Sequence, residues 1–276
     1  MSRKFHMDKI VLYCKSYRND VARAKVLSES IKRYNQENLP FYISVPRRDI
    51  NIFTNELGSD GLTILADEDI DGVNQGWEGQ QVIKSQFWKL GLCENYFSVD
   101  SDNQFIRDFY TRDFMFDNET PYTVCHEYKS FFEFLDKNPL HFDPYGGFCN
   151  DRKKIMQVFG REGTIYDFGP DPLIWSSKVW KSLFDNFITP NNLTFVDLIK
   201  FAPSEVTWYG EWLLYSQEIR LIPREEIFKN YHYRHQYEMD KKAGLTVEHL
   251  KRYYLGYALN SNFNDHHPAT DERLSY

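Results

Sequence analysis

The stretch Tyr96-Phe97-Ser98-Val99-Asp100-Ser101-Asp102 decides the fold expected for this chain. Its apolar, β-favouring half ends abruptly in two carboxylates that stand one residue apart. This pattern predicts a buried strand whose carboxyl end opens into a crevice, which is where open α/β sheets bind their ligands. Asp100 and Asp102 can both reach one divalent cation at this spacing, and hard carboxylate oxygens suit Mg²⁺ or Mn²⁺.

The segment before this strand carries a lysine that belongs with the same site. Residues 79–90 predict a helix, because apolar residues repeat there at the spacing of one helical face. Lys84 lies one residue off that face, beside Gln80. A helix that carries a lysine and precedes a strand ending in Asp-x-Asp can hold a metal-bound diphosphate from two sides.

A second acidic run shows that Asp-x-Asp alone is a weak signal. Asp67–Asp71 matches the same pattern twice and also follows a strand-like segment, residues 62–65. Four carboxylates within five residues repel one another, and most runs of this kind are solvated loops. We therefore interpret Asp67–Asp71 as a surface loop and place the site at Asp100 and Asp102.

The segment Gln75–Asp102, with Val99-Asp100-Ser101-Asp102 as its core, resembles the donor site of GT-A-type glycosyltransferases. Those enzymes use an Asp-x-Asp motif to hold a nucleotide-sugar through a divalent metal. More narrowly, residues 9–237 resemble microbial transferases of surface-polysaccharide synthesis, with Ser204-Glu205 and Tyr209-Gly210 as a second familiar segment. The resemblance implies transfer from a nucleoside-diphosphate sugar to a saccharide or glycan acceptor.

The resemblance places the metal ion, Mn²⁺ or Mg²⁺, on the aspartate pair. It implies Asp102 as the first ligand, with Asp100 and the late histidine His232 completing the set. His235 is a nearby alternative to His232. Lys84 would add a point charge on the same diphosphate oxygens.

The nucleotide itself would lie at the end of the first predicted strand, residues 9–17. There the resemblance makes Tyr17 and Asp20 candidate contacts, together with Gln80 and Lys84 from the helix before the aspartate pair. The alternative readings are a loop aromatic for Tyr17 and a helix N-cap for Asp20.

An inverting transfer also needs a carboxylate that takes the proton of the acceptor hydroxyl. Glu205 is the first choice, because the preceding serine predicts a helix start and helix starts border clefts. Its alternative role is structural, since a carboxylate in a first helical turn stabilises the helix dipole. Glu211, six residues on, is the second choice, and Asp171 is a further candidate on the acceptor side. A retaining transfer needs no such base, and the sequence leaves both mechanisms open.

Strand-like and helix-like segments alternate from residue 9 to residue 66, as is typical of parallel α/β units. We expect a single GT-A-like α/β domain over residues 1–276, with a mixed, mostly parallel sheet flanked by helices. Residues 9–105 would bind the nucleotide-sugar and residues 106–260 the acceptor, and residues 261–276 would form a polar tail. Later predicted elements are a turn with the start of a strand at Pro144–Cys149, helices at Ser177–Phe187, Asn191–Lys200, Ser204–Gln217 and Thr246–Asn260, and a strand pair or a strand and loop within Ile219–Tyr233.

Composition excludes several other classes of protein. The formal net charge of −7 argues against general nucleic-acid binding. No apolar run reaches the ~18 residues of a transmembrane helix, and the first residues lack the apolar core of a signal peptide. The four cysteines are scattered, so we expect reduced, buried thiols. We expect a cytoplasmic protein, with a peripheral position at the inner membrane face as an alternative.

Two other functions fit part of the sequence. A metal-dependent nucleotidyl or phosphoryl transferase also places carboxylates at strand ends, but it typically has an early glycine-rich phosphate loop, which this chain lacks. A non-catalytic carbohydrate-binding protein would use the aromatic residues, which are 17% of the chain, and would need neither the aspartate pair nor Lys84. Nucleoside-diphosphate binding that depends on a divalent metal would separate a glycosyltransferase from both.

Overall fold

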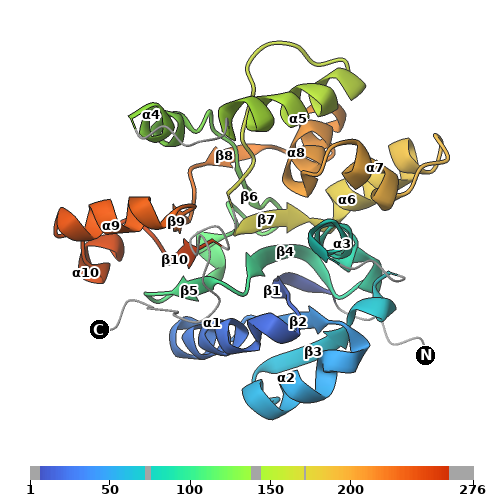
Figure 1. Ribbon diagram of the computed structural model, residues 1–276. Coiled ribbons are helices and arrows are strands. Elements are labelled where there is room, and N and C mark those ends of the chain that lie inside the picture. The colour runs from blue at the N-terminus through green and yellow to red at the C-terminus, as the bar shows by residue number, and fades with distance from the viewer. Residues whose placement is uncertain (1–6, 72–75, 138–143, 171, 261–276) are drawn as a thin grey trace, which may run out of the picture.

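The computed structural model describes residues 7–71, 76–137, 144–170 and 172–260 (Figure 1). Within these ranges the chain forms one mixed α/β domain, in which a central sheet lies between layers of helices. The expected tail at residues 261–276 lies outside the described residues. No helix in the described ranges is both long enough and apolar enough to cross a membrane.

The central sheet has five strands in the order β3-β2-β1-β4-β7. The first four are parallel to one another, and only β7 runs antiparallel, against β4. The expected mixed, mostly parallel sheet is therefore confirmed. The strands are β1 Asp8–Lys15, β2 Phe41–Val45, β3 Leu62–Ala66, β4 Cys93–Asp100 and β7 Leu173–Ser176.

Helices cover both faces of this sheet, which explains why its strands are apolar along most of their length. Successive residues of β1 point to opposite faces, so Leu12 packs in one apolar cluster and Val11 and Tyr13 in the other. One face is covered by α1 Val21–Tyr34 and α2 Ile50–Leu57. The other face is covered by α3 Gly76–Lys84, α5 Pro144–Val158, α6 Ser177–Leu183, α7 Phe195–Phe201 and α8 Glu205–Ser216.

A smaller, three-stranded sheet follows the aspartate pair, in the order β5-β10-β9. Gly256 opens β10 where a Cβ atom would lie 2.3 Å from the ring of Phe228, so only glycine fits there without movement. Two further strands, β6 and β8, form a parallel pair. The remaining elements are β5 Asn103–Phe105, β6 Tyr122–Val124, α4 Lys129–Lys137, β8 Ile222–Arg224, β9 Phe228–Tyr231, α9 Arg234–Lys242, α10 Val247–Leu250 and β10 Gly256–Leu259.

Five predicted elements differ in the structure. The two strands within Ile219–Tyr233, β8 and β9, pair with β6 and β10 rather than with each other. The helix predicted over residues 79–90 ends at Lys84 and is followed by a 3₁₀ turn at Phe87–Leu90. Pro144–Cys149 begins helix α5 rather than a turn and strand, although paired glycines disfavour a helix, because α5 packs Ile155 into the core. The helix predicted over Thr246–Asn260 is only the short α10, and the segment then forms β10. The helix predicted at Asn191–Lys200 begins only at Phe195, because Thr194 caps its first turn.

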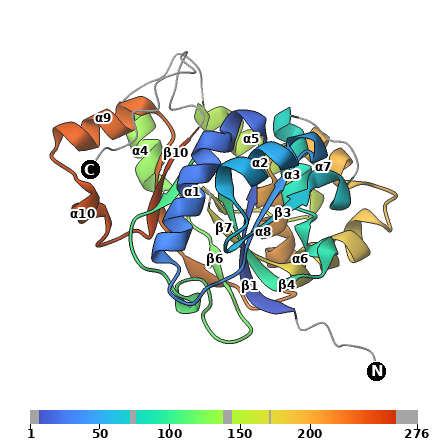
Figure 2. The same ribbon diagram turned by 90° about the horizontal axis from the view of Figure 1, so that it is seen from below.

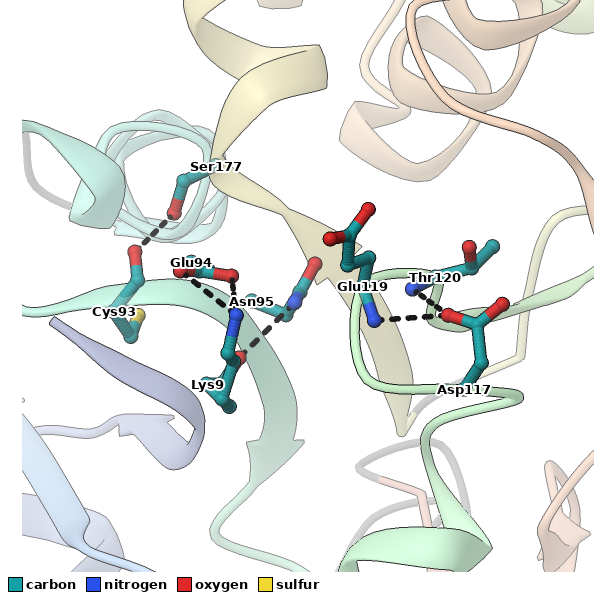
Figure 3. A network of polar contacts seen from close by, with 8 residues as sticks. All are labelled: Lys9, Cys93, Glu94, Asn95, Asp117, Glu119, Thr120 and Ser177. Carbon is teal, nitrogen blue, oxygen red and sulfur yellow. Dashed lines mark hydrogen bonds and ion pairs between the residues drawn. The ribbon is translucent and has the colours of Figure 1, made fainter.

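The amino ends of β1 and β4 are tied together (Figure 3). Lys9 Nζ lies 2.9 Å from Glu94 Oε2, and Asn95 Nδ2 donates to the carbonyl of Lys9 at 3.0 Å. Ser177 Oγ, at the start of α6, donates to the carbonyl of Cys93 at 2.9 Å. These contacts hold a register in which Lys15, at the far end of β1, lies opposite Asp100.

Candidate functional site

The candidate site begins where the parallel strands end. Lys15 is the last residue of β1, Asp100 is the last residue of β4, and the two are partners in the sheet. Lys15 Nζ lies 2.9 Å from Asp67 Oδ2, directly after β3, and both side chains are buried. The interpretation of Asp67–Asp71 as a surface loop is therefore wrong for Asp67, although Glu68 and Asp69 are exposed as expected.

Three of the predicted site residues meet beside this pair. Lys84 ends α3, and its Nζ lies 2.7 Å from Asp100 Oδ1 and 3.6 Å from Glu205 Oε1. Only 5% of the Lys84 side chain is exposed, because α3 packs Val82 and Ile83 into the core next to it. An ammonium group held between two carboxylates can also bind the oxygens of an anionic ligand.

The acidic groups at this edge outnumber the cations that face them. Burial, and then the charge of Asp100, raise the pKa of the half-buried Asp102 to about 8. Burial also raises the pKa of Asp20, and Asp100 adds to the increase while Arg23 opposes it. Asp20, Asp100 and Asp102 therefore repel one another, and a bound cation would relieve that repulsion.

The aspartate pair suits a divalent ion that takes its other ligands from a substrate. Among the described residues, no group of three or more His, Cys, Asp and Glu side chains is placed to hold a metal. His232 instead shares a hydrogen bond of 2.8 Å with the hydroxyl of Tyr128, and burial lowers its pKa to about 4. The prediction that His232 joins the aspartates is contradicted. Mg²⁺ is commonly bound by one or two carboxylates together with substrate phosphates, and Asp100 and Asp102 fit that pattern.

The two candidate bases lie in different surroundings on α8. Glu205 occupies the first turn, buried, with its backbone N–H donating to Gln81 Oε1 at 3.2 Å. Burial raises the pKa of Glu205, and Lys84 opposes the increase. Glu211 is also buried, but both of its oxygens accept hydrogen bonds from the guanidinium of Arg161. Glu205 therefore faces the Asp100 site, whereas Glu211 is held in a separate ion pair.

Comparison with known proteins places the chain in a family. Residues 9–267 match the model of a family of unknown function, DUF6492. This chain belongs to that family. No curated protein sequence matches it.

Solved structures show the fold of this DUF6492 chain. The bifunctional glycosyltransferase WbbM, in its apo form, is similar with a TM-score of 0.52 and 11% sequence identity, over 94% of this chain. The matched part is 46% of the length of WbbM. Mouse xyloside xylosyltransferase 1, also apo, is similar over 92% of this chain and 99% of that one, with a TM-score of 0.48 and 12% identity. The likeness to WbbM concerns the fold alone, which is a GT-A-type α/β fold.

The predicted nucleotide contacts of the DUF6492 chain lie after β1 and on α3. Tyr17 precedes a 3₁₀ turn and is 36% exposed. Asp20 stands directly before α1, yet its side chain does not cap the helix and instead lies 3.4 Å from Arg23. Asp20 therefore occupies the N-cap position of α1, as its alternative reading predicts, but without a capping hydrogen bond from its side chain. Gln80 is half-buried on α3, and Asp171 lies outside the described residues.

Two residues of the site were missed from the sequence. Lys15 ends an apolar strand, which is the same signal that selected Asp100, so the sequence could have shown it. Gln81 is buried beside Glu205, and its Nε2 atom has no hydrogen-bond partner in the described part of the chain. No sequence signal separates Gln81 from its neighbour Gln80, because only the packing of α3 against α8 decides which of them is buried.

Proposed function

We propose that this protein is a metal-dependent glycosyltransferase that moves a sugar from a nucleoside-diphosphate sugar to a saccharide or glycan acceptor. The observation that carries the proposal is the meeting of Lys84, Asp100 and Glu205 at the carboxyl edge of a GT-A-type sheet. Ligands of open α/β sheets bind at this edge. The fold alone would not support the proposal, because one fold serves many functions.

Asp100 and Asp102 would hold the metal ion, Mn²⁺ or Mg²⁺. Their hard oxygens support a cation at this place, and so does the charge of Asp100, which adds to the effect of burial in raising the pKa of Asp102. When bound, such an ion stabilises the negative charge that collects on a departing nucleoside diphosphate. His232 has no part in this proposal, because it bonds to Tyr128.

Lys84 would bind the diphosphate from the other side. Its ammonium group is fixed by Asp100 and Glu205, so little side-chain entropy would be lost when it contacts a phosphate oxygen. Tyr17 and Asp20 would contact the rest of the nucleotide, together with Gln80. The arrangement supports these contacts because Asp20 is close enough to Asp102 to influence its pKa.

Glu205 would act as the general base of an inverting transfer and take the proton of the acceptor hydroxyl. Burial raises its pKa, which makes its carboxylate a stronger base, while Lys84 favours the ionised form that the reaction requires. Glu211 is the weaker candidate, because Arg161 occupies both of its oxygens. A retaining transfer would leave Glu205 as the partner of Lys84. Surface-polysaccharide synthesis and a cytoplasmic location stay predictions from the sequence.

The proposal is tested by the melting temperature of the protein with UDP, GDP, CDP or ADP, each with and without Mn²⁺. We expect at least one nucleoside diphosphate to raise the melting temperature only when Mn²⁺ is present. A ligand present at 100 times its dissociation constant contributes about 2.7 kcal/mol, which is easily measured. Asp102→Asn should lose this increase, whereas Asp117→Asn, in a remote turn, should keep it. Equal stabilisation with and without Mn²⁺, or none at all, would refute the proposal.

A further inference from the structure

A hollow of about 150 Å³ lies between α4, β9 and α9, in a part of the molecule that the proposed reaction leaves unused. Both helices lie outside the central sheet, on the same side of the molecule in both views (Figures 1 and 2). A cavity of this volume holds one benzene-sized ring. The hollow is therefore large enough for a single small ring and too small for a helix or a whole nucleotide.

Aromatic side chains form one part of its lining. Phe131 stacks on Tyr128, with ring centroids 4.9 Å apart. Tyr128 is in turn fixed by its hydrogen bond to His232. Phe134 adds a third ring one turn further along α4. Rings held in this way offer an apolar surface against which the C–H face of a sugar can pack.

Polar side chains form the rest of the lining. Asn230 and Gln236 present carboxamides, which both donate and accept hydrogen bonds. Asp240 is held in place by Lys229 Nζ at 3.3 Å and by the hydroxyl of Tyr231, which donates to it at 3.0 Å. Fixed polar groups beside aromatic faces match a ring that carries hydroxyls on its edge and C–H groups on its face.

The charges in the hollow limit the kind of ring. Among the described residues of the lining, Glu226 and Asp240 are acidic, and Lys229, the one basic residue, is paired with Asp240. An acidic sugar or a phosphate would therefore meet a surplus of negative charge without a free cation to bind it. A neutral sugar meets no such repulsion, and an amino sugar would be attracted.

The hollow lies within reach of the aspartate pair. Asn230 on β9 is the partner of Ala258 on β10, which is the partner of Asn103 on β5, the residue that follows Asp102. Adjacent strands are about 4.8 Å apart, so about 10 Å separates the backbones of Asn230 and Asn103. One short oligosaccharide can span that distance.

We propose that the hollow binds one neutral or amino sugar of the acceptor glycan, while another sugar of the same glycan presents its hydroxyl near Glu205. This inference rests on the proposed function, because it takes the acceptor to be a saccharide. Selection of the acceptor then belongs to α4 and α9, whereas the donor is bound at the carboxyl edge of the central sheet.

Variants that fill the hollow test this inference. Ser130 and Met239 are exposed residues of its lining, one on α4 and one on α9, so Ser130→Trp and Met239→Trp fill it from opposite sides. Glu133→Trp places the same ring on α4 at an exposed position outside the lining. The whole protein and each variant are applied to an array of immobilised oligosaccharides that carry neutral, amino and acidic sugars. Melting temperatures, with and without nucleoside diphosphate and Mn²⁺, are measured on the same samples.

We expect the wild-type protein and Glu133→Trp to bind the same neutral or amino-sugar glycans, and both filling variants to bind them at least about tenfold more weakly. Undiminished binding by a folded filling variant, a preference for acidic glycans, or no glycan bound by the wild-type protein would overturn the inference. Glycan binding that the filling variants lose, without any nucleoside-diphosphate effect, would support the hollow and refute the transferase. A nucleoside-diphosphate effect without glycan binding would support the transferase and refute the hollow as a glycan site.

Discussion

Replacing Glu205 by glutamine separates its two roles, general base and partner of Lys84. The side chain keeps its size and loses its charge. Lys84 then loses a carboxylate at 3.6 Å but keeps Asp100 at 2.7 Å, so no buried charge is left without a partner. The cost in stability should therefore stay near 1 kcal/mol, below the roughly 3–5 kcal/mol of a broken buried pair.

Glu211→Gln is the matched control on the same helix. Arg161 loses its only carboxylate partner among the described residues, although it keeps the carbonyl of Thr164. About one fifth of the Arg161 side chain is exposed, at 21%, so water replaces part of the loss. We expect Glu211→Gln to cost about 3 kcal/mol, which lowers the melting temperature by about 6 °C or more in a chain of this size.

The two variants should rank in opposite order for activity and for stability. A general base contributes roughly 10²–10⁴ in rate, so Glu205→Gln should lower kcat by that factor while donor affinity stays near that of the wild-type protein. Glu211→Gln should keep kcat per folded molecule. The assays are single-turnover kinetics, calorimetric titration with the donor, and thermal melting. Wild-type kcat in Glu205→Gln would refute its role as base, and loss of kcat in a fully folded Glu211→Gln would move that role to Glu211.

Three further predictions follow from the charges. Asp102→Asn should abolish metal-dependent nucleotide binding yet be no less stable than the wild-type protein at pH 8.5. Burial, and then the charge of Asp100, raise the pKa of this carboxyl to about 8 in the folded protein, so its ionisation destabilises the fold increasingly from about pH 4 to 8. Lower stability of the variant at pH 8.5 would contradict the raised pKa. Lys84→Ala should lower the affinity for a nucleoside diphosphate, measured by calorimetry, far more than the affinity for the nucleoside. Lys89→Ala, at an exposed position, is the control. Equal losses of affinity for both ligands would show that Lys84 does not contact the phosphates. Burial lowers the pKa of His232 to about 4 in the folded protein, so the unfolded chain takes up the proton at higher pH and the free energy of unfolding falls as pH falls from about 6.5 to 4. Chemical denaturation should show a loss of about 2 kcal/mol in the free energy of unfolding between pH 8 and 5, and His232→Gln should lack this loss. An identical pH profile in that variant would refute the assignment.

The strand and the acidic pair at its end could be predicted because local signals carry them. Leaving aside its one serine, the run from Tyr96 to Val99 is apolar and buried on both faces, and the polarity change at Asp100 marks where the strand ends. The position of Lys84 follows from the helical period before it. The contact of Lys84 with Glu205 could not be predicted from a local pattern, because it joins residues 121 positions apart.

The rest of the site depends on packing that no local pattern shows. Asp67 is one of several similar carboxylates, and only Lys15 on a strand two places away in the sheet selects it for burial. The place of His232 in the chain suggested a metal ligand, but Tyr128, just before α4, and Phe131 on α4 determine its surroundings. Tyr257 lies at a helical spacing from Leu250, yet its segment forms the strand β10, because its backbone pairs with β5 on one side and with β9 on the other.

The position of β10 has a consequence for how the protein is made. β10 lies between β5 and β9, and the backbone N–H of Leu259 donates to the carbonyl of Asp102 at 3.3 Å. Chains grow from the amino end at about 5–20 residues per second, so the aspartate pair emerges from the ribosome long before the strand that completes its sheet. The backbone hydrogen bond between Leu259 and Asp102 therefore cannot form until residues 256–259 have also emerged, although the acidic motif lies in the first half of the chain.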